Sequence, residues 1–192
     1  MMKAFTKTII RSVWMTWERI YGVFAHRSSI YSMQYGICKV LVKKYRGSCV
    51  SCEDGTVIKQ GDYVAELHID NAEVLRLLHK GSPDRAALIV ARSLRKAVGD
   101  IHSDLDHRME FMQVKALIGI TLLHRGFSHG LGFEQQPIPS KLFKWVSTRY
   151  LRLLLAILHP EGTQRIGGQT EKLVPMMMIH TRSSLHKRFA TT

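Results

Sequence analysis

The chain has 192 residues, of which 45% are hydrophobic, and a formal net charge of +13. It is long enough to bury one core, and its composition excludes a disordered or collagen-like protein. Residues 1–48 carry a net +8 and residues 141–192 a net +7, whereas residues 49–140 carry −2. Two basic ends favour attraction to lipid headgroups, nucleic acid or an acidic polymer, although such charge can also serve solubility alone.

The first 27 residues predict an amphipathic helix. Apolar residues at helical spacing share one face, and Lys3, Lys7 and Arg11 form a basic strip beside it. Charged residues interrupt each apolar run, so we expect neither a cleavable signal peptide nor a transmembrane span. Such a helix packs on its own domain or lies in a membrane interface, and the sequence leaves both open.

Short strands are predicted between residues 35 and 70, after a polar connector at Ser28–Ser32. The segment 35–47 is rich in β-branched and aromatic residues, which favour strands. Further strands are expected on either side of Asp54-Gly55 and Gly61-Asp62, because these pairs are typical of tight turns.

Two helices and a buried strand are predicted next. Asp70-Asn71 can cap a short helix, and Pro83 lies in the first turn of a longer helix that we expect to end near Asp100. The stretch DIHSDLDHRME that begins at Asp100 predicts a polar, solvated turn. Residues 114–121, VKALIGIT, are apolar enough for a central buried strand.

Residues 140–158 predict a second basic amphipathic helix, which Ser140 can cap. Its expected apolar face consists of Leu142, Trp145, Val146, Leu153 and Ile157. Another face carries Lys141, Lys144 and Arg152, which we take as candidate membrane-surface residues. The apolar run of this helix is far too short to cross a bilayer of about 30 Å.

Shorter elements complete the chain. Residues 122–131 predict a short helix and residues 182–189 a final one. Between them, residues 172–180 predict a strand that Pro175 confines to a sheet edge or makes irregular. The mixture of strands and helices predicts one α/β or α+β domain over residues 28–192, with a small mixed sheet and basic helices near both ends.

Gly126–Gly130 fits the G-x-S-x-G pattern of a serine hydrolase. In an α/β-hydrolase the strand runs directly into the turn that carries the serine, whereas here the strand is expected to end near Thr121. A triad of Ser128, Glu171 and His180 is conceivable, but nothing in the spacing requires it. A solvent-facing Ser128 is the favoured interpretation.

Histidine and arginine side chains offer a second candidate site. His124 and Arg125 follow the central strand, and functional groups gather at the carboxyl ends of strands in α/β folds. Alternation along another strand places His68 on the same face as Glu66. A histidine beside a carboxylate can act as an acid or base, and an adjacent arginine can hold an anion. A hydrogen-bonded structural histidine is the alternative.

Metal and redox chemistry have less support. Cys49–Cys52 is a lone C-x-x-C followed by turn residues, without the second pair or the histidines of a zinc site. On a helix, His102 and Asp106 would share a face, which gives two ligands rather than three. We therefore predict no metal and no cofactor.

Three stretches resemble the YkoP-like domain of Gram-positive, largely spore-forming bacteria: KKYRG, DGTVIKQGDYVAELHIDN, and GITLLHRG followed by LGFEQQPIP. The resemblance spans roughly Trp14 to Phe189. The matching positions are Asp54, Gly55, Asp62, His68, Asn71, His124, Arg125, Gly126 and Gly132. This domain occurs alone and fused to polysaccharide deacetylases, so the resemblance implies a setting in envelope polysaccharide metabolism and assigns no reaction.

We accordingly predict an envelope accessory domain that binds an anionic membrane surface or a ligand such as a sugar phosphate. The candidate catalytic positions are His124 and His68, and the candidate ligand-binding positions are Arg125, Asp54, Asp62 and Asn71. One alternative is a small hydrolase or transferase with His124 as base and Arg125 as anion clamp. Another is a nucleic-acid-binding protein, although no known binding motif is visible. Three cysteines favour a reducing compartment, so we expect a cytoplasmic location, peripheral on the inner face of the cell membrane.

Overall fold

A computed structural model describes residues 29–70, 73–74, 76, 83–121, 130–158 and 174–189, with the backbone alone for residues 83–87 and 154–158. The predicted N-terminal helix over residues 1–27 lies outside the described residues, as does most of the predicted helix at 122–131. The candidate side chains outside them are Lys3, Lys7, Arg11, Asn71, His124, Arg125, Ser128 and Glu171.

Six strands form one mixed sheet in the order β1-β2-β5-β6-β8-β7. They are β1 (Tyr31–Tyr35), β2 (Cys38–Lys44), β5 (Tyr63–Ile69), β6 (Val114–Thr121), β7 (Glu134–Pro137) and β8 (Met176–Thr181). Strands β5 and β6 pair in parallel, and the other neighbouring strands are antiparallel. A parallel pair needs a crossover, and the connection between β5 and β6 contains helix α3 (Pro83–His107). This architecture confirms the predicted α/β or α+β class.

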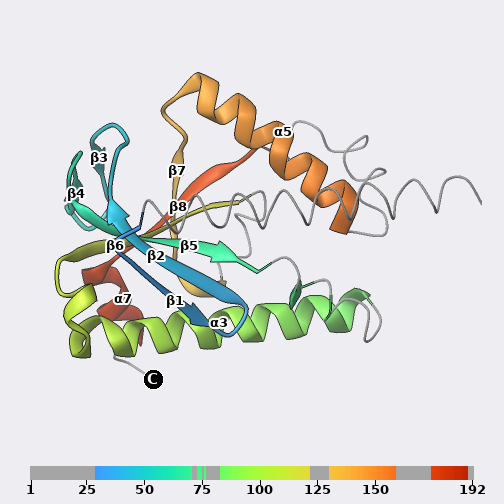
Figure 1. Cartoon of the computed structure of the whole chain (residues 1–192), viewed down its shortest axis with the longest axis horizontal. Helices are drawn as coiled ribbons and strands as arrows, with labels where there is room; N and C mark the ends of the chain where they lie inside the picture. Colours follow the sequence, from blue (N-terminus) through green and yellow to red (C-terminus); the bar gives the residue numbers. More distant parts are fainter. Residues whose placement is uncertain are drawn as a thin grey trace, which may run out of the picture.

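One face of the sheet is covered by α3 and by the short helix α7 (Arg182–Phe189) (Figure 1). The buried side chains between sheet and helices include Ala65, Leu67, Leu117, Met178, Leu94, Val98, Ile101, Leu105 and Leu185. The buried positions of α3 recur every three or four residues, as expected for one helical face. After α3, the 3-10 turn η1 (Met109–Phe111) contributes Phe111, which is fully buried in the same core.

The opposite face carries a second, smaller core. A hairpin of β3 (Val50–Ser51) and β4 (Val57–Ile58) lies over part of it. The buried side chains there include Val64, Ile118, Ile179, Val50, Ile58 and Ile138. Helix α5 (Lys141–Leu158) follows Ile138 and stands on this side of the sheet, across from α3 (Figure 1).

The turns form at the predicted places. Gly55 and Gly61 have φ angles of 84° and 94°, in the left-handed region that glycine adopts without strain. The carboxylate of Asp54 accepts a hydrogen bond from the Thr56 amide at 2.9 Å, and that of Asp62 accepts one from the Lys59 amide at 2.7 Å. Both aspartates therefore have structural roles in the turns.

Strand β1 corrects the prediction of a polar connector at Ser28–Ser32. Within that range, Tyr31 and Ser32 already belong to the strand, and Tyr31 pairs with Val42 of β2. Alternate residues of β1, which are Tyr31, Met33 and Tyr35, face the core between the sheet and α3, a pattern that the neighbouring serines obscured in the sequence. Their burial outweighs the turn preference of serine.

Helix α3 is also longer than predicted, and β8 is more central. The helix continues past Asp100 to His107, because Ile101 and Leu105 extend its apolar face and are 0% and 1% exposed. The polar stretch we expected to be a turn is thus helical.

Strand β8 is regular and lies between β6 and β7, because Pro175 precedes its first paired residue and removes no ladder hydrogen bond.

Candidate functional site

A cleft of about 700 Å³ lies on the face of the sheet away from α3. Its floor is apolar and consists mainly of Val64, Ile118, Ile120, Ile138 and Met177. Its rim carries Lys43, Lys44 and Arg46 on the side of β2, and Ser140 and Phe143 on the side of α5. Sites for small molecules typically measure about 300–1,000 Å³, so this volume can hold one.

Strand alternation selects the side chains of the cleft. In the β2–β5 pairing, Lys43 lies opposite Val64, and Leu41 lies opposite Glu66, so Lys43 and Glu66 share this face. Glu66 in turn lies beside Ile118 of β6. Beyond β2 the rim is held by Tyr45, whose amide donates to the Asp62 carbonyl at 2.7 Å.

Glu66 is an ionised carboxylate within the cleft. Lys43 forms an ion pair with its Oε2, and Nε2 of His68 lies 3.4 Å from the same oxygen. Burial would raise the pKa of Glu66, but His68 and Lys43 together lower that pKa to about 2. Glu66 is therefore an acceptor of hydrogen bonds at neutral pH.

His68 lies on this face beside Glu66, as the alternation predicted. Its Nε2 is buried and makes no hydrogen bond to any residue that the structure describes. Its contact of 3.4 Å with Oε2 of Glu66 does not have hydrogen-bond geometry. A buried ring nitrogen without a partner costs free energy, which a ligand or water that bonded to it would recover.

The cleft has a net positive rim. Lys43 and Arg46 contribute two positive charges and Glu66 one negative charge, a net +1 for the side chains on this face, whereas Lys44 pairs with Tyr63 and its ammonium lies on the α3 side of the sheet. Lys44 also lies over the ring of Tyr63, with its Nζ 5.8 Å from the ring centroid. Arg46 is exposed and makes no ion pair with the described residues, so it can approach an anion.

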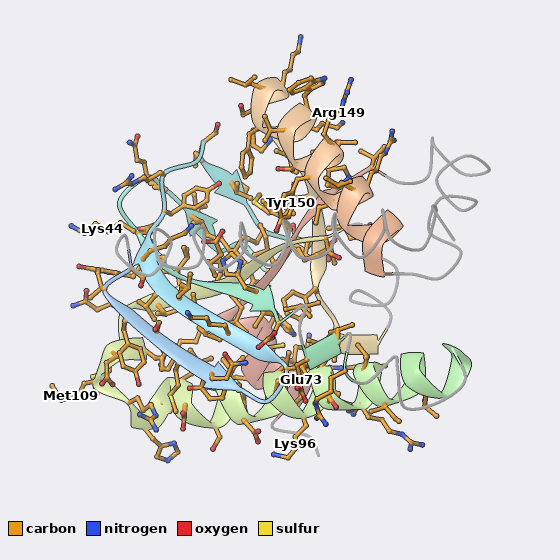
Figure 2. The ribbon with its side chains drawn as sticks, turned by 45° about the vertical axis from the view of Figure 1, so that its right-hand side comes forward. Lys44, Glu73, Lys96, Met109, Arg149 and Tyr150 are labelled. Carbon is orange, nitrogen blue, oxygen red and sulfur yellow. The ribbon has the colours of Figure 1, made fainter. Side chains whose placement is uncertain are left out.

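Helix α5 turns an apolar stripe outward. The exposed fractions of Leu142, Val146 and Leu153 are 73%, 48% and 46%, and that of Trp145 beside them is 57%. These residues recur at helical spacing and share one side of the helix. Figure 2 shows the neighbouring Arg149 directed away from the sheet and Tyr150 directed back towards it. Among the described side chains of the predicted apolar face, Leu142, Trp145, Val146 and Leu153 are therefore exposed, whereas the side chain of Ile157 lies outside the description.

Lys141, Lys144 and Arg152 flank the stripe, and Arg149 lies within it. Over Lys141–Leu158 the helix contains four cations, which are Lys141, Lys144, Arg149 and Arg152, and no acid. The guanidinium of Arg149 lies 5.0 Å from the centroid of the Trp145 ring, a cation–π contact. Ser140 caps the helix as predicted, since its Oγ accepts a hydrogen bond from the Phe143 amide at 3.3 Å.

The candidate aspartates do not join His68. Asp54 accepts a hydrogen bond from the hydroxyl of Thr181, which ties the β3–β4 hairpin to the end of β8. Asp62 forms an ion pair with Lys115 at 2.9 Å, just before the first residue of β5. His68 lies near the last residue of the same strand. The structure thus separates these three positions, and the two carboxylates hold turns together.

His180 has a structural environment. Its Nδ1 is hydrogen-bonded to the hydroxyl of Ser184, and its Nε2 lies 3.2 Å from the carbonyl of Leu131. Burial lowers the pKa of His180 to about 4, so the ring is neutral at physiological pH. Both nitrogens are occupied, which removes the basis for a catalytic triad that includes this histidine.

The cysteines and the histidines of α3 show no catalytic or metal arrangement. Cys49 is exposed, and burial raises the pKa of the Cys52 thiol to about 11, the reverse of an activated thiol. His102 and Asp106 do share a face of α3, where both approach His186 of α7. Among the described residues, no three His, Cys, Asp or Glu side chains are placed to hold a metal ion.

Sequence reasoning missed most of the cleft. Lys43 and Arg46 were not singled out, although alternation along β2 could have placed Lys43 with Glu66. The exposure of Leu142 and Val146 was also not predictable, because it depends on what lies next to α5. None of the described helices is long and apolar enough to cross a lipid bilayer.

Comparisons with known proteins place the chain in context. The profile of the YkoP domain matches residues 7–189. A curated relative from Bacillus subtilis (strain 168), named "Uncharacterized protein YkoP", is 29% identical over 129 residues, which cover 67% of this chain and 70% of the relative. No solved structure matches the chain.

Proposed function

The chain belongs to the YkoP domain family, and we propose that it binds the anionic surface of a membrane through helix α5. One observation carries the proposal: an 18-residue helix with four cations and no acid exposes a stripe of large apolar side chains to solvent. A helix that lies in a membrane interface has this division into an apolar and a basic side.

The energies are sufficient for reversible binding. Each lysine or arginine near an anionic leaflet contributes about 1 kcal/mol, so the four cations of α5 together contribute about 4 kcal/mol. Leu142, Trp145, Val146 and Leu153 add a hydrophobic contribution when they leave water. Lys141 and Lys144 project from the first turn of the helix, next to the rim of the cleft at Ser140.

Nucleic acid is the main competitor for a basic surface. Phosphate contacts would use the cations of α5 but would leave Leu142, Val146 and Leu153 in water. We favour a bilayer because its anionic headgroups can pair with the cations while its hydrocarbon region takes up the apolar side chains.

We further propose that the membrane is that of a bacterial cell and that the process concerns envelope polysaccharide. The support is the resemblance to a domain that also occurs fused to polysaccharide deacetylases. The relative from Bacillus subtilis is in keeping with this setting. An enzymatic role for His124 and Arg125 gains no separate support, because both lie outside the described residues.

The test is flotation with vesicles of phosphatidylcholine alone and with added phosphatidylglycerol. We expect binding only to the anionic vesicles, strong at about 0.1 M salt and weak at about 1 M salt, because salt screens the charges. Replacing Lys141→Ala and Lys144→Ala together should weaken binding about 30-fold, from the loss of about 2 kcal/mol.

The matched control removes two exposed cations from α3, by Arg92→Ala and Arg95→Ala. This control should bind vesicles almost as well as the wild type. Equal binding to neutral and anionic vesicles would refute the proposal, as would equal losses in the two double variants. A titration with generic DNA run in parallel identifies the competing function if only DNA binding responds to the α5 substitutions.

A further inference from the structure

The cleft and the outward face of α5 adjoin each other. Ser140 and Phe143 line the cleft, and Phe143 is itself 49% exposed at the start of the helix. If α5 lies on a bilayer, the mouth of the cleft is therefore close to the lipid. A molecule could then reach from the bilayer into the cleft without crossing the described part of the protein.

The lining of the cleft combines an apolar floor, a basic rim and the carboxylate of Glu66. The apolar floor, with Ile118, Ile120 and Met177, suits a hydrocarbon chain. The rim, with Arg46 beside the Lys43–Glu66 pair, suits a phosphate. A simple inorganic anion would leave the apolar floor in water, and a neutral lipid would leave Arg46 without an ionic partner among the described residues.

Glu66 adds a third requirement. Both Lys43 and His68 approach its Oε2, and Oε1 has no hydrogen-bond partner among the described residues. An ionised carboxylate repels a second anion but accepts hydrogen bonds from hydroxyl groups. A ligand that places a hydroxyl near Glu66 and its phosphate nearer to Arg46 satisfies both groups.

We propose that the cleft binds an anionic amphiphile with one apolar chain and a phosphate diester that carries a hydroxylated substituent. The inference deepens the proposed function, on which it rests, because it names the class of membrane molecule that α5 would bring to the cleft. Glycerol-phosphate and sugar-phosphate lipids share this chemistry.

The experiment uses calorimetric titration of the full chain with probes kept below their micelle-forming concentrations. The probes are dodecyl phosphoglycerol, dodecyl methyl phosphate, dodecylphosphocholine and chainless glycerol 3-phosphate. We expect saturable binding of dodecyl phosphoglycerol at one site. The methyl diester has the same charge without the hydroxyls and should bind about tenfold more weakly, the usual effect of one hydrogen bond to a charged group. The other two probes should bind more weakly still.

Two variants locate the site. Ile120→Trp places a larger side chain on the half-buried floor and should abolish binding of dodecyl phosphoglycerol, with the fold checked by circular dichroism. Glu66→Gln should bring the two diesters to within about twofold of each other, because the charged acceptor is lost. Arg95→Ala on α3 is the control and should change neither affinity.

The outcomes separate the two proposals. Equal affinity for all four probes, no saturable binding, or full affinity in folded Ile120→Trp would overturn the cleft assignment. Vesicle binding without probe binding would keep the role of α5 and overturn the cleft ligand. Probe binding without vesicle binding would keep the ligand chemistry and overturn the membrane role. The α5 substitution Leu142→Ser should reduce vesicle binding and leave the soluble probes unaffected.

Discussion

The two faces of the sheet differ in packing, in charge and in the presence of a cleft. The face under α3 and α7 is packed with apolar side chains, and Leu117, Met178 and Leu185 there are fully buried. The other face has a smaller core, an ion pair between Lys43 and Glu66, and a cleft of about 700 Å³. Packing of this kind on one face holds the fold, so the other face can carry charge and an open cleft.

The largest expected contrast between the faces is in core packing. Phe111→Ala removes a fully buried ring on the α3 side and should lower the free energy of unfolding by about 4 kcal/mol. Ile120→Ala in the cleft floor should cost less than about 1 kcal/mol, because that side chain is only half-buried. Urea unfolding measures both, with Phe111→Leu as a milder variant. Similar losses at the two positions would contradict the division into a packed and an open face.

Arg182 sharpens the comparison on the packed side. Its guanidinium donates to the carbonyls of Phe111 and Met112 at 3.0 Å each, and also to that of Leu105. Arg182→Met should lower the free energy of unfolding by about 2 kcal/mol, because three carbonyls, two of them in part-buried hydrogen bonds, lose a charged donor. The control Arg188→Met removes an exposed cation from the same helix and should cost less than about 0.5 kcal/mol. Equal losses of unfolding free energy in the two variants would show that the hydrogen bonds of the Arg182 guanidinium add no stability beyond its charge.

As pH falls, the first loss of stability should come from His180, on the packed face. The pKa of His180 is lowered from 6.5 to about 4, so as pH falls the unfolded chain takes up its proton before the folded chain does. Stability therefore has its full value above pH 6.5, where His180 is neutral in both states, and it is lost progressively as pH falls from 6.5 to 4. By pH 5 the wild type should lose about 2 kcal/mol of stability that a His180→Gln variant does not lose. Parallel pH profiles for the two proteins would contradict the buried, neutral state of this ring.

The cleft should respond at lower pH and by less. The pKa of Glu66 is lowered from 4.5 to about 2, so its stabilisation is present above pH 4.5 and is lost as pH falls towards 2. After allowance for its partial exposure, we expect a loss of about 1 kcal/mol near pH 3 that Glu66→Gln does not show. Urea midpoints at pH 5 and pH 3 measure the difference. A larger acid loss from Glu66 than from His180 would reverse the comparison.

Local sequence patterns predicted much of the fold. Alternation along β5 placed Glu66 and His68 on one face, and Ser140 marked the start of α5. These signals depend on neighbours within a few residues, which the sequence displays directly. The same reasoning failed at Ser32 and Pro175, where pairing with another strand decided the outcome.

The cleft could not be predicted in the same way. Its walls come from β2, β5, β6, β8 and the start of α5, which are far apart in the sequence. Whether Leu142 or Val146 is buried depends on which surface α5 faces, and helical periodicity does not contain that information. The sequence did indicate the net charge and the apolar face of this helix, and the structure adds that Leu142, Trp145, Val146 and Leu153 of that face are exposed.

The most direct test of the membrane role follows the indole of Trp145, one of three tryptophans in the chain. In a variant with Trp14→Phe and Trp17→Phe, vesicles that contain phosphatidylglycerol should shift the Trp145 emission to the blue, and lipids brominated in the acyl chain should quench it. If this variant binds the vesicles while its emission neither shifts nor is quenched, α5 does not face the bilayer and the account is wrong.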